Sequence, residues 1–325
     1  PNLASAVINN GGVGSFGFAY STPVQIEETL VKTKRLTSGP INTNFFVFNP
    51  VSIPEQSTEM EAFDALKALP FCDQVPLAFP KAPFHPDLNA QLEVIWACRP
   101  QILTFHLGIP PANVINKALS LDIAVGITAT NLEEALAVER AGASFVVAQG
   151  YEAGGHRGNF DSKSEDPNLL IEDLLVILAP EIAVPLLAAG GIMTGQDLVR
   201  KLRIGATAVQ MGTAFLCCDE AGTSRTNRDY LTNYGDRGTS MTKAFSGRAA
   251  RGINNEFMHL MEGKETLPFP LQNTLTALMR VKAAKSYDGE YQSFWAGSGF
   301  PAIRSVPVSQ LMRELSEEMT LESTP

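Results

Sequence analysis

The chain has 325 residues, of which 45% are hydrophobic and 18% charged, so it can bury a sizeable core and disorder is excluded. Its net charge of −9 argues against a nucleic acid or an anionic membrane as its partner. The cysteines have no CxxC or metal-ligand spacing, and no stretch resembles a signal peptide or a membrane span, so we expect reduced thiols, no metal and a cytoplasmic protein. The cysteines are Cys72, Cys98, Cys217 and Cys218.

Up to residue 98 the predicted elements are unevenly spaced. A first helix ends at the Asn-Gly run of residues 9–12, and residues 50–86 hold seven prolines around one predicted helix, 59–69. We interpret residues 50–86 as an elaboration of the scaffold rather than a separate domain. The other elements expected here are strands over residues 13–19 and 41–47 and helices from Thr22 and over residues 87–98.

From residue 102 strands and helices alternate regularly. Strands separated by single helices require parallel pairing with right-handed crossovers, and the seven strands in total favour a TIM (β/α)8 barrel over an open sheet. A barrel also needs a strand before the first helix. Either residues before Pro1 supply it or the barrel is open there, and we favour the first explanation. The further strands are expected over residues 102–105, 123–127, 144–148, 184–188 and 206–210, and the helices over residues 111–120, 131–141, 168–178 and 195–203.

The pattern changes after residue 218, where glycine, threonine and arginine fill residues 222–252. We therefore divide the chain into a barrel, residues 1–218, and a mostly helical cap on the substrate side, residues 219–325. Helices in the cap are expected over residues 254–261, 272–285 and 309–319, with a proline-rich link at residues 268–270.

The segment AQGYEAGGHRG, residues 148–158, is the most informative stretch. It places four glycines, a carboxylate, an imidazole and a guanidinium directly behind a buried strand, where α/β proteins bind ligands. Taken singly, it is as readily an ordinary flexible loop. His156 in this loop and His106 after another strand would project over the same barrel mouth, where an imidazole can transfer a proton. The usual alternative, a core or turn histidine, is assigned to His85 and His259.

Two further glycine turns follow the last two strands, at residues 188–192 and 210–215. In barrels these loops commonly form a phosphate site, because free backbone N–H groups at a helix N-terminus attract an anion. Ordinary tight turns explain one such segment easily and two less well, so a bound phosphate group is expected. Asn44 and Gln149 end two other strands, and their amides suit the mixed edge of a heterocycle or, equally, a strand-end cap.

Together these motifs resemble the nitronate monooxygenase family, formerly called 2-nitropropane dioxygenases, over nearly the whole chain. Any one motif is weak, but five in order are specific. The likeness extends to SGRAARG at residues 246–252 and WAG at residues 295–297, which look like motifs of the class I branch. The five motifs are NTN at 42–44, TFHLG at 104–108, the glycine loop at 148–158, AAGGIM at 188–193 and QMGTAF at 210–215.

The resemblance implies a flavoprotein oxidoreductase, a TIM barrel with non-covalent FMN that oxidises alkyl nitronates, typically propionate 3-nitronate, with O2 to a carbonyl compound and nitrite or nitrate. His106 and His156 would be the catalytic pair on the substrate side of the flavin. His156 matches the histidine proposed as base for neutral nitroalkanes, whereas an already anionic nitronate needs only an imidazole that holds its charge. FMN would be bound by Asn44, Gln149, Gly154, Gly190, Gly191, Gln210, Met211, Gly212 and Thr213.

Two departures from the family and two alternatives remain. The first strand of the family, of the type Gln-Ala-Pro-Met, is missing, and Gln272 and Thr276 stand where class I tends to carry a tyrosine and a lysine near the substrate.

Two alternative functions share part of this pattern. An FMN-dependent enoyl-acyl carrier protein reductase shares the Glu-x-Gly-Gly-His loop but uses NAD(P)H, and Arg157 favours the oxidase. The retained histidines argue against a barrel that only binds FMN. A homodimer is one option for the assembly.

Overall fold

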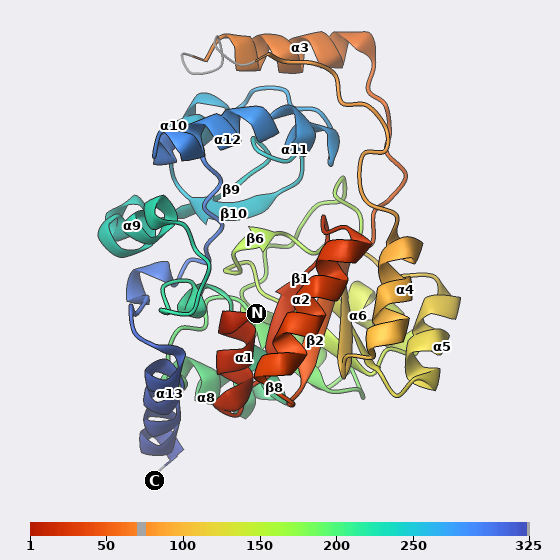
Figure 1. Cartoon of the computed structure of the whole chain (residues 1–325), viewed down its shortest axis with the longest axis vertical. Coiled ribbons are helices and arrows are strands. Elements are labelled where there is room, and N and C mark those ends of the chain that lie inside the picture. The colour runs from red at the N-terminus through yellow and green to blue at the C-terminus, as the bar shows by residue number, and fades with distance from the viewer. Residues whose placement is uncertain (70–75, 324–325) are drawn as a thin grey trace.

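The computed structural model describes residues 1–69 and 76–323, so Pro70 and Cys72 of the sequence interpretation lie outside the described residues. Its centre is a sheet of seven strands in the order β1-β2-β3-β4-β5-β7-β8, and every neighbouring pair is parallel. This curled parallel sheet with surrounding helices confirms the predicted TIM-barrel-type fold (Figure 1). The strands are β1 (Gly14–Gly17), β2 (Ile41–Phe46), β3 (Ile102–His106), β4 (Ala124–Ala129), β5 (Phe145–Gln149), β7 (Leu186–Ala189) and β8 (Ala208–Gln210).

The helices between these strands follow the predicted order. A capping box at Thr22 starts the second helix, and Asn131 caps the helix after β4, as its residue type predicts. The helix expected from residue 168 begins later, at Ile171, because Asn168 has a left-handed φ of +52°. The helices are α1 (Asn2–Asn9), α2 (Pro23–Leu36), α4 (Leu88–Cys98), α5 (Ala112–Ser120), α6 (Leu132–Arg140), α7 (Ile171–Leu178) and α8 (Gly195–Ile204).

The edge strands of the sheet are β1 and β8. Within residues 1–69 and 76–323, no further strand joins them, so the sheet has the opening at which the sequence predicted a missing strand.

Two apolar cores follow from the side-chain alternation of the strands. The larger core lies between strands and helices and includes Phe45, Phe105 and Ile127. The smaller core fills the barrel and includes Phe145 and Val147. Because side chains alternate along a strand, the residues two and four positions after an interior residue also face the interior. The polar side chains at the strand ends therefore share the barrel mouth.

Besides its helices, the cap contains an antiparallel sheet, which the sequence did not predict. Its sheet has the order β6-β10-β9, and β6 (Gly155–His156) comes from the glycine loop of the barrel. The helix expected over residues 272–285 is divided into α11 and α12 at Thr276. The other cap elements are α9 (Arg225–Asn233), β9 (Thr239–Thr242), β10 (Ala250–Ile253), α10 (Glu256–Leu260), α11 (Leu271–Leu275) and α12 (Ala277–Lys285).

Two helices lie away from their neighbours in sequence. Helix α3 (Gln56–Lys67), from the proline-rich segment, extends across the cap in Figure 1, and its Ala62 and Leu66 are buried in one cluster with Leu267 and Phe257 of the cap. Helix α13 (Val308–Ser323) packs against α8 and α1 of the barrel. The division of the chain at residue 218 remains a prediction.

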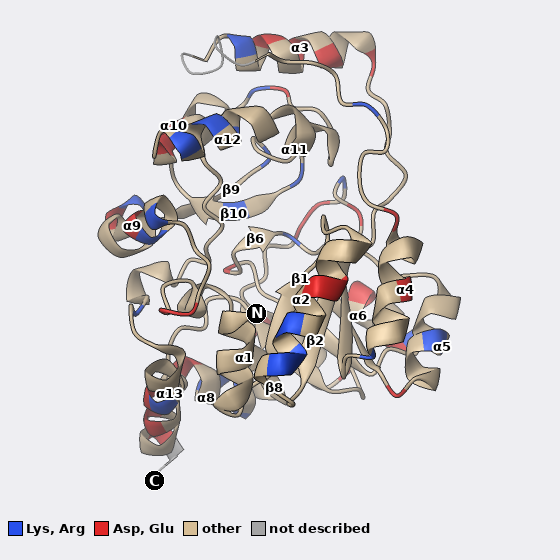
Figure 2. Ribbon diagram, viewed as in Figure 1, with Lys and Arg blue, Asp and Glu red and all other residues tan. Residues whose placement is uncertain are grey.

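Charged side chains of both signs are spread over the outer helices (Figure 2). Of the described helices, none combines the length and apolar character needed to cross a membrane. Cys217 and Cys218 are buried free thiols and Cys98 is partly buried, as the sequence predicted for these three residues.

Candidate functional site

Polar side chains meet inside the mouth of the barrel. Asn44 of β2 lies opposite Thr104 of β3, and its Nδ2 donates to the Thr104 Oγ1 at 2.9 Å. Phe46 and His106 form the next inward pair, and Gln149 ends β5 on the interior side. The mouth therefore presents amide and imidazole groups above the apolar interior.

The backbone carbonyl of His156 joins these strand ends to the glycine loop. It accepts a hydrogen bond from the Gln149 Nε2 at 3.1 Å and lies 2.9 Å from the His106 Nε2. A carbonyl oxygen can only accept, so the Nε2 of a neutral His106 carries its hydrogen and the Nδ1 does not. Gln149 also accepts from the Gly158 N–H at 2.7 Å. His106 and Gln149 thus fix the loop at two points.

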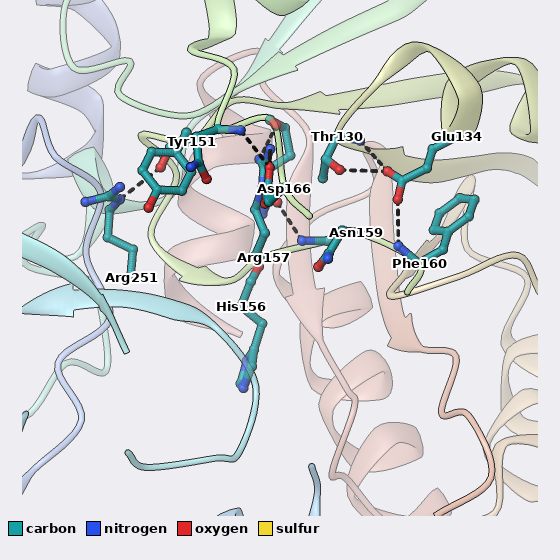
Figure 3. A network of polar contacts seen from close by, with 12 residues as sticks. Thr130, Glu134, Tyr151, His156, Arg157, Asn159, Phe160, Asp166 and Arg251 are labelled. Atoms are coloured by element: carbon teal, nitrogen blue, oxygen red, sulfur yellow. Dashed lines mark hydrogen bonds and ion pairs between the residues drawn. The ribbon is translucent and has the colours of Figure 1, made fainter. Parts of the chain in front are cut away.

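The His156 side chain points away from the polar network beside it (Figure 3). Its Nε2 lies 3.0 Å from the Ser246 Oγ, and its ring centroid is within 6 Å of the rings of Phe46, Phe269 and Trp295. His106 contacts the same Phe46 ring, with 5.6 Å between the two ring centroids, so the imidazoles and these aromatic rings form one cluster, the histidine cluster. The structure therefore brings the two predicted histidines together.

Both imidazoles are neutral at pH 7. Loss of hydration on burial, together with the smaller effects of the charges of His106, Arg248 and Arg280, lowers the pKa of His156 to about 3. Burial likewise lowers the pKa of His106 to about 4, although its hydrogen bond to the His156 carbonyl acts in the opposite direction. A neutral imidazole can accept a proton, or donate an N–H to a bound anion, without a resident charge to neutralise.

The side-chain contacts of Arg157 lie within the loop that follows β5 and at the end of β5. Its side chain is 2% exposed, and Nε and Nη2 form a bidentate pair with Asp166 at 2.6 and 3.1 Å, while Nη1 donates to the Gln149 carbonyl at 2.6 Å. Figure 3 shows Arg157 and His156 on opposite sides of the chain, as successive residues of an extended segment must be. The buried pair of Arg157 and Asp166 therefore orients the strand that presents His156.

The predicted cofactor residues, apart from Asn44, line one cavity of about 240 Å³. Gly191 has a left-handed φ of +67°, and a Cβ at Gly212 would meet no atom within 4 Å, so glycine keeps this space open. In the described part of the chain, the backbone N–H groups of Gly191 and Gly212 have no protein acceptor. Two unpaired amides in a glycine-lined cavity are typical of an anion site. The residues are Gln149, Gly154, Gly190, Gly191, Gln210, Met211, Gly212 and Thr213.

These amides do not belong to a helix N-terminus, although the sequence predicted that they would. The N-terminus of α8 is capped within the protein, because Asp197 accepts from the Met193 and Thr194 N–H groups at 3.0 Å and Glu318 accepts from the Gly195 N–H at 2.6 Å. Only a three-residue 3-10 helix, Thr213–Phe215, follows β8. The unpaired amides are therefore those of the turns themselves and not of a helix N-terminus.

The WAG segment connects this cavity to the histidines. Trp295 lines the cavity and contacts the His156 ring, and the Gly297 N–H donates to the Thr213 Oγ1 at 3.0 Å. A Cβ at Gly154 would lie 2.5 Å from the backbone of Ala296 and of Gly297, so this approach requires glycine. In the sequence, this segment is recognisable only as a motif of the class I branch.

Several residues near the histidine cluster had no clear sign in the sequence. Phe48 stacks between His85 and Phe269, and its ring centroid lies 4.2 and 5.7 Å from theirs. His85, predicted to be a core or turn histidine, therefore packs in an aromatic stack. The side chain of His259 is 82% exposed. In the sequence, the only sign of this stack is the alternation of Phe46 and Phe48 at and just beyond the end of β2.

Gln272 and Thr276, at 0% and 1% exposure, bind backbone carbonyls of the cap. The Gln272 Nε2 donates to the Ala244 carbonyl at 2.9 Å and the Thr276 Oγ1 to the Phe245 carbonyl at 2.7 Å. These two bonds hold the segment that leads to Ser246, the partner of His156.

A family model described as nitronate monooxygenase matches residues 1–318. The chain belongs to the nitronate monooxygenase family. A probable nitronate monooxygenase from Staphylococcus haemolyticus is 35% identical over 98% of this chain and 90% of the relative. The solved nitroalkane oxidase from Streptomyces ansochromogenes is 33% identical, covers 100% of this chain and 93% of that chain, and superposes with a TM-score of 0.93. FabK from Thermotoga maritima, at 24% identity and a TM-score of 0.74 over 99% of this chain and 89% of that chain, shares the fold.

Proposed function

We propose that this nitronate monooxygenase family member binds FMN and oxidises alkyl nitronates of the propionate 3-nitronate type with O2, giving a carbonyl compound and nitrite or nitrate. The observation that carries the proposal is the cavity with unpaired amides at Gly191 and Gly212 beside two neutral imidazoles. The solved nitroalkane oxidase with a TM-score of 0.93 supports the reaction class.

The glycine-lined cavity suits the phosphate end of FMN. Its volume of about 240 Å³ is below the roughly 300–1,000 Å³ of pockets that enclose a whole ligand, so it would hold the phosphate while the rest of FMN extends toward the mouth. Gly191 and Gly212 would donate to the phosphate, and Gln149 and Asn44 lie toward the histidines. When bound, FMN supplies the oxidation chemistry, and the protein supplies position and electrostatics.

His156 would act on the substrate from the histidine cluster. With an anionic nitronate, its N–H stabilises the charge on the nitro oxygens. With a neutral nitroalkane, it must accept the proton of the α-carbon. Its pKa of about 3 makes it a weak base in the free protein, so the nitronate is the better substrate. Ser246, which also contacts the Arg248 carbonyl at 3.1 Å, would orient the ring.

Visible spectroscopy tests the proposal. We expect the purified protein to be yellow, and an anaerobic addition of propionate 3-nitronate to bleach the flavin, whereas NADPH leaves it oxidised. Bleaching by NADPH alone would establish the enoyl reductase alternative. A yellow protein that consumes no O2 with any nitronate would be a binding barrel, and a colourless protein that takes up no FMN would end the proposal.

The base role of His156 is tested by His156→Asn, with the exposed His259→Asn as matched control. We expect the variant to retain FMN and to lose about 10²–10⁴-fold in kcat/KM with neutral nitroalkanes, the usual contribution of a general base, and far less with nitronates. An equal loss with both substrates would rule out a base role.

A further inference from the structure

A large cavity, of about 750 Å³, lies between the segment that follows β2, the segment that follows the glycine loop and the cap. We call it the lysine cavity, after Lys163 beyond the glycine loop and Lys243 and Lys264 of the cap. Among the described residues, none lines both this cavity and the glycine-lined one. Its volume is within the roughly 300–1,000 Å³ of pockets that enclose a whole small ligand. The lysine cavity therefore has room for a ligand outside the glycine-lined cavity.

The inner end of the lysine cavity is formed by neighbours of both histidines. Phe269 lines it, and the ring centroid of Phe269 lies 5.4 Å from that of His156. Leu107, which follows His106 in the chain, also lines it. The His156 ring contacts Trp295, which lines the glycine-lined cavity. Rings of the histidine cluster thus line both cavities, so the two cavities meet at this cluster.

The lining of the lysine cavity changes from exposed to buried toward its inner end. Lys163, Lys243 and Lys264 are exposed, whereas Leu107 and Arg248 are 2% and 4% exposed. A cavity whose lining is solvated on one side and buried on the other is open to solvent and leads inward. The lysine cavity therefore leads from solvent to the histidine cluster, which it reaches at the ring of Phe269.

Cations outnumber anions in this lining. Four cations and two carboxylates give it a net charge of +2, in a chain whose net charge is −9. Burial lowers the pKa of Arg248 to about 10, so this guanidinium stays charged at pH 7. In the described part of the chain, no carboxylate lies within 4.0 Å of the ammonium group of any of the three lysines. The cations are Lys163, Lys243, Arg248 and Lys264, and the carboxylates are Asp161 and Glu265.

We propose that the lysine cavity is the entrance through which nitronates reach the histidine cluster, and that its cations attract these anions against the negative charge of the whole molecule. A cleft lined by charges of one sign concentrates ligands of the opposite sign and raises their association rate. The lysines act on the arrival of the substrate and do not touch its reacting atoms, so their effect belongs to KM and not to kcat. This inference rests on the proposed function and adds the route by which its substrate arrives.

The sign of the salt effect tests the proposal. Screening weakens whichever field governs the approach of the anion, and the Debye length falls from about 30 Å at about 0.01 M ionic strength to about 3 Å at about 1 M. If the lysine cavity governs the approach, kcat/KM for propionate 3-nitronate falls over this range. If the net charge of −9 governs it, kcat/KM rises instead. We expect a fall of about tenfold, at the lower end of the effects of electrostatic steering.

A triple variant removes the local field. In the described part of the chain, the side chains of the three lysines form no hydrogen bond and are exposed, so the combination of Lys163→Gln, Lys243→Gln and Lys264→Gln should fold. At low ionic strength we expect its kcat/KM to be about tenfold lower than that of the wild type. The loss should appear in KM, with kcat per bound flavin unchanged, and kcat/KM should no longer fall with salt.

A second triple variant is the matched control. Lys117→Gln, Lys285→Gln and Arg313→Gln remove three positive charges from exposed residues that do not line the lysine cavity. Each triple variant changes the net charge by the same amount, but only the first changes the entrance. We expect the control to keep the salt-dependent fall of the wild type and to stay close to it in KM.

Two results would overturn the entrance role and leave the proposed function intact. One is a wild-type kcat/KM that rises with ionic strength or does not change. The other is equal kcat/KM in the two triple variants, because any effect would then come from the total charge and not from the cavity. A flavin-containing wild type that does not oxidise propionate 3-nitronate at any ionic strength would instead refute the proposed function.

Discussion

Gly212 is the residue at which the anion site can be tested most directly. A side chain at this position would extend into open space rather than into protein, so substitution should leave the fold intact. Gly212→Asp places a carboxylate beside the proposed phosphate, and the like charges repel strongly in a partly buried site. We expect the flavin content of the purified protein to fall by at least about tenfold, as one buried charge contact of roughly 1.4 kcal/mol or more implies.

Two controls separate charge from size in that experiment. Gly212→Asn has the same shape without the charge and should retain more flavin than the aspartate. Gly222→Asp adds the same charge at an exposed glycine with no atom near its Cβ position and should have no effect. Unchanged flavin in Gly212→Asp would show that the phosphate lies elsewhere.

At the scale of single residues, the sequence was informative where residue type and chain position agree. His106, Gln149 and Gly212 each end or follow a strand, so their place at the mouth follows from alternation and strand direction. Ser246 could not be found in this way, because it lies in the cap, 90 residues after His156. Its approach to His156 depends on how the cap folds over the barrel.

At the scale of elements, the glycine loop is a strand of the cap sheet. His156 pairs with Ala250 of β10, and Gly155 pairs with Arg251. Strands β6, β9 and β10 are not flanked by regularly spaced helices as the barrel strands are, and β6 exists only because it pairs with the distant β10. Sequence periodicity therefore predicted the barrel strands and gave no sign of these three.

The pair of Arg157 and Asp166 should decide whether this loop keeps its shape. Asp166→Ala leaves the Arg157 guanidinium, which is 2% exposed, without its carboxylate. Breaking a buried pair costs about 3–5 kcal/mol, and the 19% exposure of Asp166 reduces our expectation to about 2–3 kcal/mol in the free energy of unfolding. Urea denaturation followed by fluorescence measures this loss.

Asp161→Ala is the matched control, because it removes an exposed carboxylate from the same loop that bonds only to Lys163 and Ser164 nearby and to Asn159 through its backbone. We expect this variant to unfold close to the wild type. Equal stability of the two variants would mean that Arg157 finds another partner and does not depend on Asp166.

At the scale of the whole molecule, the barrel follows from local patterns and the cap does not. Regular alternation of apolar strands and amphipathic helices fixes a parallel barrel almost without long-range information. The placement of α3 on the cap and of α13 on the barrel depends on which apolar surfaces remain uncovered after the barrel forms. The sequence gives their amphipathic character but not their partners, which is why the domain division at residue 218 was drawn from sequence order.

Closure of the cap over the mouth also makes the stability of the molecule depend on pH. The unfolded chain binds protons at His106 and His156 below a pKa of about 6.5, whereas the folded protein does so only near pH 4 and pH 3. Between these values the unfolded state binds more protons, so the free energy of unfolding falls as the pH falls from 6.5. At pH 5 we expect a loss of about 1–2 kcal/mol for each histidine, relative to pH 7.5.

A comparison of the wild type with His156→Asn measures this loss. Subtracting the unfolding free energy of His156→Asn from that of the wild type at each pH cancels the contribution of the carboxylates and isolates that of one imidazole. That difference should decrease by about 1–2 kcal/mol between pH 7.5 and pH 5, whereas the same subtraction with His259→Asn, at an exposed position, should give a flat line. A flat line for His156 as well would mean that its ring stays hydrated and that the cap does not exclude water from the mouth.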